Sequence, residues 1–207
     1  DALRKGRPYF ALRAPNQLLL EAVTPSDETV AVLVTNEDRF MGFEVGDARC
    51  RTGAPCAENV GMLFPVALDN IQLIRLLHGR PPLIGGQFEG PTKLKAPARL
   101  RVAIKGENQI EQFIDFSPDG KDVLATDILR EGEVSLRIKY AEYRDVSTEV
   151  RIPGELIVEN PQQSTRVRIQ VTDVNFFDPT PDTFGTQCPV GKLIMPMTCG
   201  PSAVVPQ

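Results

Sequence analysis

The residues of this chain that could perform chemistry are few. The single histidine is His78, and any Ser-His-Asp hydrolase site would have to use it. No serine lies in the Gly-flanked context of a nucleophile elbow. A histidine at the end of a helix also has a structural role, because it complements the helix dipole. His78 directly precedes Gly79, which suits this structural role, and we therefore predict that the chain is not an enzyme.

Carboxylate pairs and metal ligands give no stronger signal. Glycosidases need two opposed carboxyl groups, but acidic residues such as Glu155 and Glu159 occupy alternate positions of amphipathic strands and should face water. Asp173, Asp178 and Asp182 could hold calcium, yet their spacing is unlike that of an EF-hand loop. We predict solvated charges at these positions, no metal site and no cofactor.

The four cysteines form two local pairs, Cys50 with Cys56 and Cys188 with Cys199. Each pair lies in a loop-like segment that contains proline and glycine, so two short-range disulfides are the simplest interpretation, with free thiols or zinc as the alternatives. Structural zinc sites favour closer spacings such as C-x2-C. Disulfides indicate an oxidising compartment, and we predict an extracytoplasmic protein.

Composition narrows the possible classes. The chain has 207 residues, of which 42% are hydrophobic, enough for one sizeable core. Its net charge of −4, with charges of both signs interspersed, argues against a nucleic-acid-binding surface. No apolar run reaches the roughly 18–20 residues that span a bilayer. The sequence begins at Asp1, so we expect that a targeting segment was removed or that the chain was trimmed, and a lipidated N-terminal cysteine would lie upstream.

Alternation of apolar and polar residues dominates the pattern and predicts about nine or ten strands, mostly antiparallel. The predicted strands are Tyr9–Arg13, Gln17–Val23, Thr29–Thr35, Arg39–Val45, Ala98–Lys105, Gln109–Phe116, Asp122–Leu129, Glu133–Tyr140, Gly154–Glu159 and Ser164–Val174. Strands with one wet face should form a curved sheet whose concave apolar face needs a cover.

A helix is predicted in the middle of the chain. Asp69 is a good N-cap, apolar residues recur at helical spacing from Ile71 to Leu77, and Gly79 followed by two prolines ends the pattern. A second, short helix could occupy Ala57–Phe64. The fold class that follows is α+β, mostly β: an unclosed, curved antiparallel β half-barrel in which the helix Asp69–His78 acts as a lid or plug.

From about Arg7 to Val174 the chain resembles the LolA/LolB group of periplasmic lipoprotein carriers and outer-membrane lipoprotein receptors of Gram-negative bacteria. Three stretches carry the resemblance: the strand–turn–strand opening at Tyr9–Asp47, the helix with its flanking prolines at Pro65–Ile84, and the tyrosine-containing strands at Val134–Val174. The sequence looks most similar to the LolB-like lipoproteins.

The resemblance implies a half-barrel that holds lipid or lipoprotein acyl chains in an apolar interior, as part of lipoprotein trafficking to the outer membrane. Burial of an acyl chain is hydrophobic, about 0.8 kcal/mol per methylene, and needs no catalytic residues. The candidate lining residues are Leu18, Leu20, Val32, Leu100, Val102, Ile104, Leu136, Ile138, Val167 and Ile169 from strands, with Ile74 and Leu77 from the lid. A shift of one residue in any strand would exchange its two faces.

The resemblance also implies a domain division, partners and a location. The half-barrel would span residues 1–177, and a Pro-rich extension stapled by disulfides would span 178–207. The expected partners are lipid acyl chains or lipoproteins, with other envelope proteins, at the periplasmic side of the outer membrane, which an N-terminal lipid anchor outside this chain would reach. The alternative is a non-catalytic structural or adaptor lipoprotein of an envelope assembly, with the same fold and a filled interior.

One departure from the family bears on activity. LolB-type receptors carry an apolar tip in the turn that corresponds to Thr24–Asp27, whereas this turn is polar. A hydroxyl and a charge are costly to bury in hydrocarbon. We therefore predict that this domain, without a lipid anchor, binds neutral liposomes weakly and does not itself insert lipoproteins.

Overall fold

The computed structural model describes residues 6–62 and 68–200. The chain forms two compact units, one of Asp1–Ile74 with Phe177–Ser202 and one that begins at Arg75 and runs to Phe176. Each unit is built around one unclosed sheet, and the predicted mostly-β fold class is confirmed. No helix in the described part of the chain is both long and apolar enough to cross a membrane.

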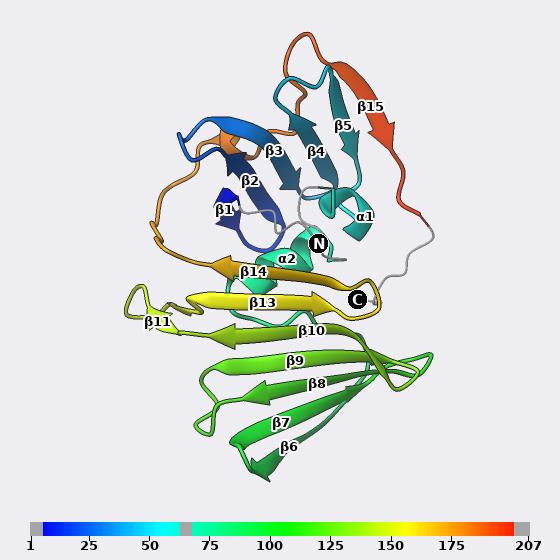
Figure 1. The fold of residues 1–207 in the computed structure, drawn as a ribbon, viewed down its shortest axis with the longest axis vertical. Coiled ribbons are helices and arrows are strands. Elements are labelled where there is room, and N and C mark those ends of the chain that lie inside the picture. The colour runs from blue at the N-terminus through cyan, green and yellow to red at the C-terminus, as the bar shows by residue number, and fades with distance from the viewer. Residues whose placement is uncertain (1–5, 63–67, 201–207) are drawn as a thin grey trace. The chain divides into compact units, whose positions relative to one another are not determined.

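The sheet of the first unit has six strands in the order β1-β2-β3-β4-β5-β15 (Figure 1). Its strands are β1 (Arg7–Arg13), β2 (Gln17–Val23), β3 (Thr29–Asn36), β4 (Arg39–Glu44), β5 (Arg49–Gly53) and β15 (Leu193–Met197). The first four were predicted to within two residues at their ends. The alternation is weak in β5 and β15, which sequence analysis left as loop and tail.

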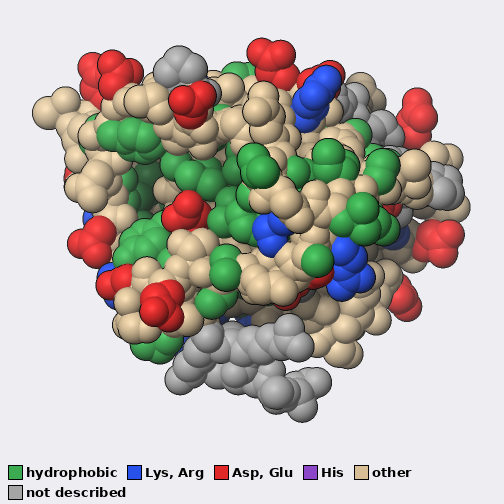
Figure 2. Space-filling model, turned by 90° about the horizontal axis from the view of Figure 1, so that it is seen from above, with side chains coloured by type: hydrophobic (Ala, Val, Ile, Leu, Met, Phe, Trp, Pro, Cys, Tyr) green, Lys and Arg blue, Asp and Glu red, His purple; other side chains and the backbone are tan. Residues whose placement is uncertain are grey.

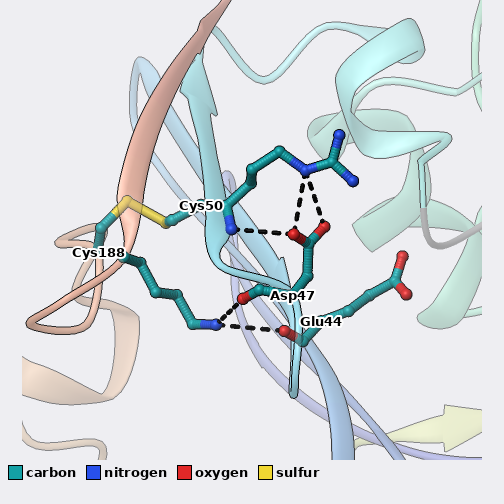
Figure 3. Close-up of a disulfide and its surroundings, with 6 residues drawn as sticks. Glu44, Asp47, Cys50 and Cys188 are labelled. Atoms are coloured by element: carbon teal, nitrogen blue, oxygen red, sulfur yellow. Dashed lines mark hydrogen bonds and ion pairs between the residues drawn. A yellow bond between two sulfur atoms is a disulfide. The ribbon is translucent and has the colours of Figure 1, made fainter.

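β15 pairs with β5 in parallel, with Leu193 beside Arg49 and Ile194 beside Cys50. This pairing overturns the predicted disulfides. The bonds are Cys50–Cys188 and Cys56–Cys199, across 138 and 143 residues of sequence, and not the local pairs. Figure 3 shows the first of them together with Glu44 and Asp47, whose carboxylate binds Arg49. The local prediction failed because the C-terminal strand brings each distant cysteine closer than its neighbour in sequence.

The two bonds tie the C-terminal segment to the first unit at both ends of β15. In the chain-entropy account, a cross-link that closes a loop of more than a hundred residues stabilises a protein by about 5 kcal/mol. The assignment of 178–207 as a separate extension stays a prediction, and the described part of that segment packs with the first unit.

The helices of the chain are short. α1 (Ala57–Val60) lies within the predicted helix Ala57–Phe64, whose last residues fall outside the described part. α2 (Asn70–Leu77) confirms the predicted helix. Asp69 caps it as expected, because its carboxylate accepts the backbone N–H of Gln72 at 2.8 Å and Gln72 Oε1 accepts the N–H of Asp69 at 3.3 Å.

α2 ends in a left-handed residue. Gly79 has φ +73°, and its N–H donates to the carbonyl of Leu76, while the N–H of Arg80 donates to the carbonyl of Arg75. These two bonds form a Schellman motif. A side chain at position 79 would also meet Pro153 at 2.7 Å, so only glycine suits this helix end.

The second unit contains a seven-stranded antiparallel sheet in the order β14-β13-β10-β9-β8-β7-β6 (Figure 1). Its strands are β6 (Gln87–Lys95), β7 (Ala98–Lys105), β8 (Ile110–Phe116), β9 (Val123–Arg130), β10 (Glu133–Ala141), β13 (Glu155–Asn160) and β14 (Thr165–Gln170); β11 (Arg144–Asp145) and β12 (Arg151–Ile152) form a separate pair, and a 3-10 helix, η1 (Pro181–Phe184), follows in the first unit. All but β6 and the β11–β12 pair were predicted.

One face of this sheet is polar and is held by ion pairs. Arg101 binds Asp115 through two hydrogen bonds of 2.7 and 2.9 Å, and Arg137 binds Asp127 in the same way at 2.8 and 3.0 Å. The neighbouring carboxylates raise the pKa of both guanidinium groups. Glu155 and Glu159, predicted to be solvated, pair with Arg168 and Arg166 instead. The other face of the sheet is therefore the one available for an apolar site.

Candidate apolar binding face

Seven of the predicted lining residues lie on one face of the seven-stranded sheet. The strand register aligns Val102, Ile114, Thr126, Ile138, Val158 and Val167 in one row from β7 to β14. A second row contains Ile104, Gln112, Ile128 and Leu136, and Leu100 and Ile169 continue the same face. The predicted strand parity is therefore correct in this unit. We call this surface the apolar face.

The centre of the apolar face is buried and one margin is open. Ile104 and Ile138 have no exposed surface, and Ile169 and Leu136 are nearly buried. Leu100, Val102 and Val167 are half-buried. Phe88 on edge strand β6 faces Ile104 across the β6–β7 pairing and is 61% exposed. Because such an apolar ring is costly to leave in water, the margin near β6 and β7 is where an apolar ligand would gain most.

A polar side chain lies in the middle of the apolar face. Gln112 is completely buried, and its Nε2 donates to Thr126 Oγ1 at 2.9 Å and to the carbonyl of Pro82 at 2.6 Å, while its Oε1 accepts the N–H of Ile84 at 3.0 Å. The segment after α2 therefore crosses the apolar face. We call Gly79–Ile84 the strap.

Two tyrosines also hold the strap. Tyr140 donates to the carbonyl of Arg80 at 3.4 Å and Tyr143 to that of Gly79 at 3.3 Å. Burial raises the pKa of both phenols, that of Tyr140 well above its ordinary value of 10.0. Within the second unit, these hydrogen bonds fasten the strap, and not the helix α2, across the apolar face.

Sequence reasoning missed Gln112, Thr126 and Phe88. A signal for Gln112 exists, because it interrupts the alternating apolar residues Ile110, Ile114 and Phe116. A polar residue at an inward position has to be hydrogen-bonded, which points to a backbone segment above it. Phe88 was missed because β6 is irregular: its pairing with β7 shifts at Gly90-Pro91, so the strand shows no clear alternation.

The remaining predicted lining residues belong mostly to the first unit. Leu18 and Leu20 are buried there on the same face as Leu33 and Thr35. Val32 lies on the opposite face, because it pairs with Glu21, and it packs on a cluster of Val34, Met41, Cys50 and Phe184. The prediction that Val32 shares a face with Leu18 and Leu20 is therefore wrong by one residue of register. Ile74 and Leu77 are buried on α2, and the lining by residues of both units stays a prediction.

The residues considered for chemistry are dispersed. His78 is half-buried at the end of α2, and Asp173, Asp178 and Asp182 are exposed. In the part of the chain that the structure describes, one group has the geometry of three metal ligands, Cys56, Glu58 and Cys199. Its two sulfur atoms are bonded to each other, which takes them out of metal coordination.

Comparison with known proteins identifies similar folds among solved structures but no relative by sequence. No protein-family model matches the chain, and no curated protein matches it. Among solved structures, a LolA superfamily protein from Nitrosomonas europaea is similar over 87% of this chain and 81% of its own, with a TM-score of 0.60 and 10% sequence identity.

A second solved structure agrees. It is a domain from Vibrio parahaemolyticus whose name refers to outer membrane lipoprotein sorting, similar over 81% of this chain and 75% of its own, with a TM-score of 0.54 and 10% identity. At this identity the likeness speaks for architecture alone. The chain has the fold of the LolA-superfamily proteins.

Proposed function

We propose that this chain is a non-catalytic binding protein of the Gram-negative envelope that holds lipid or lipoprotein acyl chains against its apolar face. The observation that carries the proposal is the apolar face, whose margin at Phe88, Leu100 and Val102 is open beside the strap. Acyl chains need apolar area and no special polar contacts. The LolA-superfamily fold supports the same ligand class.

We also propose that the protein is periplasmic. Two disulfides suit an oxidising compartment, so the protein would face the periplasm and serve lipoprotein trafficking to the outer membrane. Its partners would be acyl chains, lipoproteins and other envelope proteins. The closer similarity to LolB-like lipoproteins, and an N-terminal lipid anchor outside this chain, are parts of this proposal.

A specific observation supports the alternative, an adaptor with the same fold. The strap is fastened across the apolar face by Gln112, Tyr140 and Tyr143, and it occupies space that an acyl chain would need. An adaptor would keep this strap in place permanently, whereas a carrier would use the open margin beside it.

A pair of substitutions on one strand separates the two functions. Val102→Glu places a charge on the apolar face, and Ala103→Glu, the control, places it on the opposite face of β7. Both residues are half-buried, so both variants should fold. Binding of a fluorescent fatty acid should fall at least about tenfold for Val102→Glu, because an acyl chain would have to desolvate the charge.

The measurement has two arms. A carrier loses fatty-acid binding in Val102→Glu and keeps it in Ala103→Glu. An adaptor shows no saturable fatty-acid binding in the unmodified chain, and that result would refute the carrier function. Circular dichroism on both variants verifies that a lost signal does not reflect unfolding.

A further inference from the structure

Exposed apolar side chains gather at one end of the six-stranded sheet. Seven of the twelve large hydrophobic side chains that are exposed among the described residues lie there or along β15. We call five of them the apolar end: Val30, Val45, Val190, Leu193 and Ile194, with exposures of 42, 59, 105, 62 and 58%. Figure 2 shows hydrophobic side chains reaching the surface over one face of the molecule, with Lys and Arg among them.

Backbone hydrogen bonds hold these residues close together. The N–H of Val45 donates to the carbonyl of Val30 at 2.8 Å, and the N–H of Leu193 donates to that of Ala48 at 2.7 Å. Lys192 reaches across to the carbonyl groups of Glu44 and Asp47 at 3.3 and 2.5 Å. The β4–β5 turn and the segment that enters β15 therefore form one surface.

Val190 occupies the most exposed position of this surface. It follows Pro189 and precedes Gly191, whose φ is +87°, and the N–H of Lys192 donates to the carbonyl of Pro189 at 3.3 Å. These features describe a type II turn with valine at its tip. A turn tip usually carries polar residues, so a fully exposed valine there calls for a partner.

We propose that the apolar end is a membrane contact that rests on the surface of a phospholipid bilayer. Two observations favour lipid over a protein strand. The first is the direction of the backbone N–H groups in β15. The Leu193 N–H points to β5, so the backbone N of each alternate residue, Ile194 and Pro196, points away from β5 to the outer edge of the sheet. Pro196 offers no N–H at this outer edge, which hinders the addition of another strand.

The second observation is that β15 is apolar on both of its faces. Leu193 and Met195 lie on one face and Ile194 on the other, and all five residues of the strand are exposed. A protein partner packs against one face of a strand, whereas lipid chains and headgroups surround a protruding edge. This edge is fixed in place by its pairing with β5, where Ile194 lies beside Cys50, and by the Cys50–Cys188 bond.

The charges around the apolar end suit zwitterionic headgroups. Asp47 lies between Arg49 and Arg51, at 3.0 and 3.9 Å, and Arg49 lowers its pKa to about 2. Asp27, on the neighbouring turn, pairs with Arg7 at 3.2 Å. Paired charges of both signs match the paired charges of phosphatidylethanolamine, without the long-range repulsion that a net negative surface would bring. This membrane contact is separate from acyl-chain binding on the apolar face. It would give stronger liposome binding than the Thr24–Asp27 turn predicts, and the vesicle experiment decides between the two.

The absence of tryptophan from the chain permits a direct test. Val190→Trp gives a single reporter at the apolar end, and Asp38→Trp gives one in the β3–β4 turn, at the opposite end of β4. With zwitterionic phosphatidylethanolamine–phosphatidylcholine vesicles, the Val190→Trp emission should shift to shorter wavelength and be quenched by brominated lipid. The Asp38→Trp emission should not change.

A second experiment removes apolar side chains from the apolar end and needs no tryptophan reporter. Leu193→Ser with Ile194→Ser should lower the vesicle-bound fraction of the otherwise unmodified chain about tenfold or more, given the apolar area removed. A Val190→Trp signal unaffected by vesicles would overturn the proposal. So would a chain that is dimeric in light scattering and becomes monomeric in the double variant without binding vesicles, because the occupant would then be a second copy. Fatty-acid binding by the apolar face is measured separately, so failure here leaves the proposed function standing.

Discussion

Gln112 and Pro82, thirty residues apart in sequence, are joined by a hydrogen bond of 2.6 Å from the glutamine amide to the proline carbonyl. The same side chain accepts the N–H of Ile84. One buried amide therefore fixes the strap on an otherwise apolar face. Because it satisfies backbone groups that would otherwise be buried without partners, its effect on stability should exceed that of an ordinary surface hydrogen bond.

Gln112→Leu tests this role. The substitution leaves the carbonyl of Pro82 and the N–H of Ile84 without their partner, and the free energy of unfolding should fall by about 2–4 kcal/mol. Urea denaturation measures the loss, and hydrogen exchange at the Ile84 amide should accelerate. Gln162→Leu, at an exposed glutamine in the β13–β14 turn, is the control. Equal stability of the two variants would mean that the strap does not depend on Gln112.

The disulfide connectivity can be verified chemically. Peptide mapping without reduction should recover one peptide pair joined through Cys50 and Cys188 and another through Cys56 and Cys199. Recovery of Cys50 joined to Cys56 would contradict the parallel β5–β15 pairing. Cys50→Ala with Cys188→Ala should lower the free energy of unfolding by about 3 kcal/mol in the chain-entropy account, measured by denaturant unfolding against the parent chain. The loss is smaller than for a lone long-range bond because the retained Cys56–Cys199 bond leaves only the 6 residues from Cys50 to Cys56 and the 11 from Cys188 to Cys199 in the loop.

Alkaline pH should destabilise the second unit. Burial raises the pKa of Tyr140 and Tyr143 above the ordinary value of 10.0, so the folded state favours the protonated phenols. Their contribution is fully present below about pH 10 and is lost as the pH rises toward the higher pKa of the folded state. Tyr140→Phe should flatten this alkaline loss in denaturant unfolding. An unchanged slope would indicate that the loss has another cause.

The predictable part of the fold follows from strong local patterns. Ala98–Lys105 and Glu133–Tyr140 alternate in sequence between apolar residues and mostly charged or polar ones, which predicts strands with one apolar and one polar face. Asp69 and Gly79 mark the ends of α2 through capping and left-handed geometry, which depend on the residue itself. These signals were sufficient for the strand parity of the apolar face.

The rest depends on contacts that the local sequence does not encode. β15 is a short strand because it lies beside β5, and the cysteine partners follow from that long-range pairing. Val32 was placed on the wrong face because β3 carries hydrophobic residues on both sides, with Leu33 on one and Val34 on the other. Where both faces of a strand are apolar, alternation does not fix which face is which.

The polar Thr24–Asp27 turn can be changed to test which end of the six-stranded sheet contacts the membrane. It connects β2 to β3, so it lies at the same end of the sheet as the β4–β5 turn that carries Val45. Ser26 is exposed and bonds only the neighbouring Thr24 hydroxyl, at 2.9 Å, among the contacts described. Ser26→Leu should therefore extend the apolar end at little cost in stability and raise vesicle binding several-fold. Asp38→Leu, at the opposite end of the sheet, should leave vesicle binding unchanged. In vesicle flotation, equal gains from both substitutions would show that binding follows overall hydrophobicity, and that the membrane does not select this end of the sheet.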